Sequence, residues 1–178
     1  MEDSIQLLHN RELYTRVISQ SVLSAEKFVW IATANLKDMH IEMARGYKPI
    51  LEVFDESAKR GVMFRIIHSD LPSRPFRDTL EKLPRLSGQA MELQICPRSH
   101  WKMVIVDGKE AYFGSANFTG AGLGVKSEHR RNLEIGAMIT DTQKVKVLMS
   151  LFDKFWMGDY CRDCAFRKKC PDPISSRN

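Results

Sequence analysis

The chain has 178 residues, of which 43% are hydrophobic and 28% are charged. These fractions are typical of a folded domain with its own core and exclude an intrinsically disordered chain. No apolar run is long enough to cross a membrane. The acidic start Met1-Glu2-Asp3-Ser4 lacks the basic and apolar regions of a secretory signal, so we expect a cytoplasmic protein.

The net charge of +5 is unevenly distributed along the chain. Residues 98–131 carry six basic and three acidic side chains, and residues 161–178 carry five basic and two acidic ones. The positive surplus therefore lies in these two segments, while the rest of the chain is close to neutral. Such a concentration is expected of a surface that binds a polyanion, although an ordinary solvated basic surface is the alternative.

The hydrophobic pattern predicts helices that alternate with strands. In chain order, we expect a helix over 10–27, a buried strand over 28–34, a loop over 36–47, a helix from Pro49 to Gly61, a strand over 63–68 and a short helix over 76–86. Strands over 91–96, 101–107 and 110–114 follow, then a glycine-rich loop over 117–128, a strand over 132–140 and a helix over 142–156. Asp107-Gly108 is a hairpin turn signal. This order indicates a layered α/β domain with a mixed sheet.

A histidine and a lysine begin the segment with the clearest chemical signal. His100 and Lys102 are separated by one residue, so on an extended strand their side chains leave the same face. An imidazole beside an ammonium group favours an anion, and a phosphate is the most common anion of this kind. Ser115 and Asn117 follow the expected hairpin and add a hydroxyl and an amide.

The pattern His100-x-Lys102-x4-Asp107, followed by Gly114-Ser115-x-Asn117, resembles the HKD signature of the phospholipase D superfamily. Glu134 on the following strand is similar as well. By motif the resemblance covers about residues 90–140, and by element order about 28–156. It implies a phospholipase D-like layered domain over residues 1–157, with a mixed sheet flanked by helices on both faces.

The resemblance also implies a metal-independent phosphodiesterase that works through a phosphohistidine. His100 would be the nucleophile or the acid and base, while Lys102 and Asn117 would hold the non-bridging phosphate oxygens. Ser115 would add a hydrogen bond, and Glu134 would orient the imidazole. Taken alone, Ser115 and Asn117 would be turn formers and Glu134 would be a surface strand residue.

Other residues near the motif have simpler expected roles. Asp107 is expected to be a structural turn residue rather than a catalytic group. Arg130 and Arg131 are candidates for contacts with substrate phosphates. Trp101 and Phe118 are candidates for base stacking, although Trp101 should point away from His100 and would then belong to the core.

The chain contains one HKD motif, whereas the implied mechanism uses two histidines. The remaining histidines lack a matching partner pattern and are treated as non-catalytic: His9, His40, His68 and His129. A two-fold axis would bring the same patch of two subunits together, so that one motif per chain would suffice. The direct prediction is a homodimer.

Four cysteines form the second motif of the chain. Cys161-x2-Cys164-x5-Cys170 has the spacing of metal ligands, and Cys96 is a possible fourth ligand. This motif is similar to the iron–sulfur staple of RecB-type nucleases such as the Cas4 family. A Cys₄ zinc site is equally natural. Either one would be structural and would attach the basic tail, residues 158–178, to the domain.

The substrate is not defined by the motif, because the superfamily includes nucleases and lipid hydrolases. The basic flanks, the small size and the single motif favour a nuclease that acts on DNA or RNA. One alternative is a phosphodiesterase of a cardiolipin-type phospholipid, for which Met39, Ile41 and Met43 are the only candidates for an apolar rim. A second alternative is a non-catalytic nucleic-acid-binding subunit of a larger complex.

Overall fold

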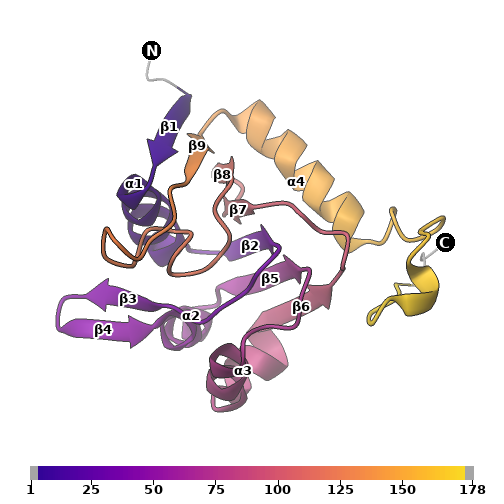
Figure 1. Ribbon diagram of the computed structural model, residues 1–178, viewed down its shortest axis with the longest axis horizontal. Coiled ribbons are helices and arrows are strands. Elements are labelled where there is room, and N and C mark those ends of the chain that lie inside the picture. The colour runs from indigo at the N-terminus through magenta and orange to yellow at the C-terminus, as the bar shows by residue number, and fades with distance from the viewer. Residues whose placement is uncertain (1–3, 175–178) are drawn as a thin grey trace.

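The computed structural model describes residues 4–174, which form a central sheet covered on both faces by helices (Figure 1). The strands of the sheet lie in the order β1-β9-β8-β7-β2-β5-β6. Their bounds are β1 (Ile5–His9), β2 (Phe28–Thr33), β5 (Met63–His68), β6 (Met91–Ile95), β7 (Met103–Val106), β8 (Glu110–Gly114) and β9 (Ile135–Ile139). Since β2, β5 and β6 run parallel and the other neighbours pair antiparallel, the sheet is mixed, as predicted.

The helical segments divide between the two faces. The chain contains α1 (Arg11–Leu13), the π-helical η1 (Tyr14–Ser21), the short η2 (Val22–Ser24), α2 (Ile50–Lys59), α3 (Arg74–Glu81), η3 (Leu86–Ala90), α4 (Thr142–Trp156) and η4 (Arg167–Lys169). The first core contains residues of η1, α2 and α3, and the second contains those of α4. The prediction of helices on both faces is therefore confirmed.

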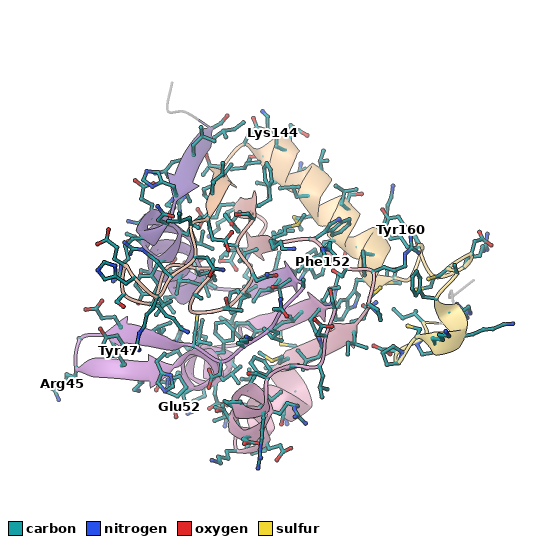
Figure 2. The ribbon with its side chains drawn as sticks, in the orientation of Figure 1. Arg45, Tyr47, Glu52, Lys144, Phe152 and Tyr160 are labelled. Atoms are coloured by element: carbon teal, nitrogen blue, oxygen red, sulfur yellow. The ribbon has the colours of Figure 1, made fainter. Side chains whose placement is uncertain are left out.

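Strand β2 shows how the sequence builds both cores. Val29 and Ile31 are fully buried in the core of the η1 and α2 face. Trp30 points to the other face, where its ring stacks on Phe152 of α4 at 5.1 Å between centroids. Figure 2 shows Phe152 between α4 and the sheet. A continuous apolar run is required here because both sides of the central strand are covered.

The prediction of a loop over 36–47 is wrong. Strands β3 (His40–Met43) and β4 (Gly46–Pro49) form a separate hairpin that extends beside α2 (Figure 1). Gly46 has a φ of 100°, which a glycine adopts without strain at the turn. Ile41 is fully buried between exposed neighbours, so the alternation of a strand is present but lasts only four residues.

Three further predictions differ from the structure. Strand β1 was not expected, because only Leu8 of its five residues is buried and its stability comes from pairing with β9. The expected helix over 10–27 is mostly π-helical, and the Ser21 hydroxyl donates to the Arg16 carbonyl across that turn at 2.9 Å. The strand expected over 101–107 begins only at Met103.

The helix predicted over 142–156 is confirmed as α4, and Asp141 caps it by accepting a hydrogen bond from the Lys144 N–H at 2.9 Å. Beyond α4 the chain continues as a tail to the last described residue, Ile174. The division into 1–157 and 158–178 stays a prediction, and residues 1–3 and 175–178 at its outer ends lie outside the described residues. Within the described range, no helix has the length and apolar character needed to span a bilayer.

Candidate active site

The residues of the HKD pattern gather where β2 ends and β7 begins. Strand β7 pairs antiparallel with β2, so that Met103 lies opposite Ala32 near the carboxyl end of β2. The Gly114 N–H donates to the Lys102 carbonyl at 3.1 Å, which holds the start of β7 beside the end of β8. The carboxyl ends of parallel strands are a common place for ligand sites in open α/β sheets.

His100 and Lys102 lie on the segment before β7 rather than within the strand itself. The expectation that a strand aligns their side chains is therefore wrong in detail. His100 is exposed, and its ring makes no hydrogen bond to any residue in 4–174. The Lys102 Nζ donates to the His100 carbonyl at 2.8 Å, which leaves two of its three N–H donors for an anion.

Ser115 and Glu134 are in direct contact. The Ser115 hydroxyl donates to the Glu134 carboxylate and accepts from the Ile135 N–H at 3.1 Å. The other carboxylate oxygen of Glu134 accepts from the Asn132 side chain at 3.0 Å. Within residues 4–174 the Glu134 carboxylate therefore accepts from Ser115 and Asn132, and its role in orienting His100 stays a prediction.

Asn10 supports Glu134 through the backbone and was not foreseen from the sequence. The Asn10 N–H donates to the Glu134 carbonyl at 3.0 Å, and the Asn10 side-chain oxygen accepts from the Glu134 N–H at 3.2 Å. Asn10 has a φ of 49°, a conformation that asparagine tolerates better than most residues. In the sequence, Asn10 is only a polar residue before the predicted helix. Its partner Glu134 is brought beside it by the pairing of β1 with β9.

Asn117 is anchored to the end of β2. Its side-chain oxygen accepts from the Ala34 N–H at 3.1 Å and the Asn35 N–H at 3.2 Å. The Thr33 hydroxyl is 3.3 Å from the same oxygen. The Asn117 amide nitrogen donates to no described residue, so this orientation leaves two N–H donors for a phosphate oxygen.

The close pairing of β8 and β9 requires small residues beside the site. A side chain at Gly114 would place its first carbon 2.6 Å from both the Gly136 Cα and the Ile135 carbonyl oxygen. Tyr112 lies beside both glycines and accepts from the Ala116 N–H at 3.3 Å, and burial raises the pKa of its hydroxyl to about 12. The glycine before Ser115 therefore serves packing, which holds Ser115 against Glu134.

Asp107 has the structural position expected of it. Its carboxylate accepts from the N–H groups of three successive residues where β2 begins, Glu26, Lys27 and Phe28, at 2.8–2.9 Å. Asp107 has a φ of 54° and Gly108 a φ of 67°, which confirms the predicted turn. Burial raises the pKa of Asp107, but the three backbone hydrogen bonds outweigh it and hold the pKa below its ordinary value of 3.8.

We expect Asp107→Ala to lower the free energy of unfolding by about 2–4 kcal/mol, because it leaves three N–H donors without their acceptor and places alanine at a positive φ. Since the folded pKa lies below 3.8, the carboxylate contributes fully above that pH and loses its contribution as the pH falls through the folded value. Urea unfolding measured against pH checks this. The difference between wild type and Asp107→Asn should shrink below pH 3.8, and a pH-independent difference would contradict it.

The remaining predicted contact residues are separated by the structure into two groups. Arg130 and Arg131 lie on the loop between Asn117 and Glu134 and form no ion pair within residues 4–174. Phe118 is buried and packs near Phe54, with 6.3 Å between the ring centroids. Trp101 packs on Phe155 of α4 at 5.1 Å. Phe118 therefore belongs to the protein interior, whereas Trp101 is partly buried and packs against the core that contains α4.

The four cysteines lie together beside this site. Cys96, Cys161, Cys164 and Cys170 all line one cavity of about 240 Å³, and none forms a disulfide. In the part of the chain that the structure describes, no three His, Cys, Asp or Glu side chains are arranged to share a single metal ion. The cysteines are thus neighbours, and their role as metal ligands stays a prediction.

Comparisons with known proteins agree with this geometry. The family described as "Cardiolipin synthase, PLD-like domain" matches residues 18–156. Nuc from Salmonella typhimurium, a phospholipase D family member, has a similar structure (TM-score 0.60, 20% identity, 86% of this chain and 93% of that one). NucT from Helicobacter pylori is comparable (TM-score 0.60, 18% identity, 85% and 96%).

A third similar structure belongs to a longer protein. TrmBL2, an archaeal chromatin protein, matches with a TM-score of 0.58 and 15% identity, over 86% of this chain and 52% of that one. The present chain therefore spans about half of TrmBL2. No curated protein sequence matches the chain. On the strength of the family match over residues 18–156, the chain belongs to the phospholipase D superfamily, in the family of the PLD-like domain of cardiolipin synthase.

Proposed function

We propose that this protein is a phosphodiesterase that cleaves nucleic acid through a phosphohistidine at His100. The observation that carries the proposal is the placement of the HKD residues at one end of the sheet. There, Lys102 keeps free ammonium donors, Asn117 is anchored with its amide nitrogen unused, and Ser115 is held against Glu134. Exposed His100 stands at the start of the same segment, where an imidazole nitrogen can reach a phosphorus atom.

The chemistry proceeds in two displacements. His100 attacks the phosphorus, a P–N bond forms, the ester P–O bond breaks, and the leaving oxygen takes a proton from a second imidazole. That imidazole, now neutral, removes a proton from water, whose oxygen attacks the phosphorus and breaks the P–N bond. Lys102 and Asn117 donate to the non-bridging oxygens and stabilise the added negative charge of each transition state. No step uses a metal ion.

The second imidazole is the equivalent histidine of another copy of the chain. An exposed apolar area on one sheet face, the β1–β9 patch, supports such a dimer. It is formed by Leu7 (79% exposed), Phe113 (45%) and Ile135 (69%). The strand register places these residues on the same face, and Ile135 is bonded to Ser115 of the site. A two-fold contact across this patch would cover apolar surface and bring two sites together.

Nucleic acid is the favoured substrate because the charges near the site suit a phosphate backbone. Arg130 is exposed, Arg131 is partly exposed, and both lie on the loop that joins Asn117 to Glu134. With Phe118 buried and Trp101 packed on Phe155, recognition relies on phosphate contacts, which carry little sequence information. We therefore expect a nuclease with little sequence preference, and the DNA binding named for TrmBL2 is compatible with this.

A phospholipid of the cardiolipin type is the second candidate, since the matching family takes its name from cardiolipin synthase. The residues considered for an apolar rim weaken this alternative. Met39 and Ile41 are buried in the core, and Met43 is only partly buried and packs against it. The described surface near the site thus lacks the apolar side chains that this reading assigned to lipid contact.

A substrate panel in the presence of EDTA tests the proposal. Single-stranded DNA, double-stranded DNA, RNA and cardiolipin vesicles are incubated with the protein, and the products are separated and quantified. We expect cleavage of at least one nucleic acid that EDTA does not reduce, because the mechanism uses no metal. Hydrolysis of cardiolipin alone would favour the lipid alternative, and binding without cleavage would favour a non-catalytic subunit.

A further inference from the structure

The tail after α4 has almost no apolar interior of its own. Between residues 158 and 174 its only regular element is the three-residue η4, and most of its side chains are exposed. The residues that escape full exposure are Gly158, Cys161, Cys164, Cys170 and Ile174. A segment this short and polar needs a cross-link or a metal to hold one conformation.

The tail nevertheless returns to the domain at a defined place. Asp172 accepts a hydrogen bond from the Ile95 N–H at 3.3 Å, next to Cys96 at the end of β6. Tyr160 packs on Phe155 at 5.7 Å between centroids and meets Trp101 edge-on at 6.5 Å. Figure 2 shows Tyr160 where the chain leaves α4. These contacts place the three tail cysteines opposite Cys96, a residue that is distant in sequence.

The lining of the shared cavity suits a sulfur-bound, negatively charged group. Four free thiols contribute to a volume of about 240 Å³. Aromatic rings, among them Trp101 and Phe166, form much of the remaining wall, while Arg98 and Arg167 supply positive charge. Four thiolates without an oxygen or imidazole ligand select soft metals, which means zinc or an iron–sulfur cluster.

The size of the shared cavity favours the larger of these two groups, since about 240 Å³ is far more than one zinc ion fills. In a tetrahedral site with Zn–S bonds of about 2.3 Å, the sulfurs would lie only about 3.8 Å apart. Among residues 4–174, no such convergence of three or more ligands is found. A cubane cluster binds each thiolate at a different iron, so its four cysteines stay farther apart around a larger volume. We infer that Cys96, Cys161, Cys164 and Cys170 hold a [4Fe–4S] cluster that staples the tail to the end of β6.

The full-length protein, purified without oxygen and reconstituted with ferrous iron and sulfide, tests this assignment. We expect about four iron and four sulfide per chain and a broad visible absorption band. In Cys161→Ser/Cys164→Ser the iron and sulfide content and the visible absorption should fall to background. Ala165→Ser, which adds a serine to the same exposed segment, should match wild type. Cys96→Ser should also lose the cluster, and full iron content in that variant would overturn the role of Cys96.

Two further readouts bear on the metal and on the staple. One zinc per chain that persists through reconstitution, with no iron or sulfide taken up, would overturn the cluster, and the absence of any bound metal would overturn the site. With the cluster bound, a protease should leave the tail intact. After a chelator removes the iron, the protease should cut the chain after α4. Equal cleavage with and without iron would overturn the stapling role. None of these readouts depends on nuclease activity.

Discussion

His100→Ala is expected to lower the rate of phosphodiester cleavage by a factor on the order of 10⁴–10⁶, because it removes the nucleophile and the equivalent acid of a second copy at once. Stability should change little, since the exposed His100 ring makes no hydrogen bond within the described chain. Single-turnover cleavage of a labelled oligonucleotide measures the rate, and thermal unfolding of the same sample measures the stability.

His129→Ala is the matched control for this experiment. His129 is another exposed histidine, and it lies on the loop between Asn117 and Glu134 without a predicted role. It should retain the activity of wild type in the same buffer. If His100→Ala keeps more than about a tenth of the activity, the phosphohistidine mechanism is wrong, because loss of a nucleophile costs far more than that.

Charging the β1–β9 patch should dissociate the dimer and remove activity with it. In Leu7→Glu/Ile135→Glu, two carboxylates replace apolar side chains that are 79% and 69% exposed in the single chain. Covering them in a dimer would cost about 2–4 kcal/mol, which weakens association by a factor of about 30 to 10³. Sedimentation velocity over a concentration series measures association, and the same samples are assayed for cleavage.

The control for the patch comes from the opposite edge of the sheet. Met63 of β5 and Leu93 of β6 are 45% and 37% exposed, so Met63→Glu/Leu93→Glu makes the same chemical change away from the patch. We expect this variant to remain dimeric and active. A wild-type protein that sediments as a monomer at concentrations where it cleaves at full rate would contradict the shared site.

Much of the fold could be predicted because its signals are local. Apolar runs marked the central strand β2, and an apolar helical face marked α4. The Asp107-Gly108 turn was predictable for the same reason, since few residues other than glycine, asparagine and aspartate accept a positive φ. Strands β1 and β3 were missed because each buries too few residues to show a period.

The residues of the site were likewise predictable where the signal is local and were missed where it depends on strand pairing. The spacing of His100, Lys102 and Asn117 resembles the phospholipase D signature, and that resemblance implies phosphodiester chemistry. The contact of Ser115 with Glu134 joins residues brought together only by the pairing of β8 and β9. The support from Asn10 likewise depends on a strand that the sequence did not reveal.

The sequence by itself determined the fold class and, through its motif, the superfamily, since these depend on short-range pattern and residue identity. Only the tertiary structure decided that Asp107 caps three backbone N–H groups, that Phe118 is buried while Trp101 packs on Phe155, and that an apolar patch adjoins the site. It also placed Cys96 beside the tail cysteines. These features arise from strand register and packing between distant segments, which no local pattern encodes.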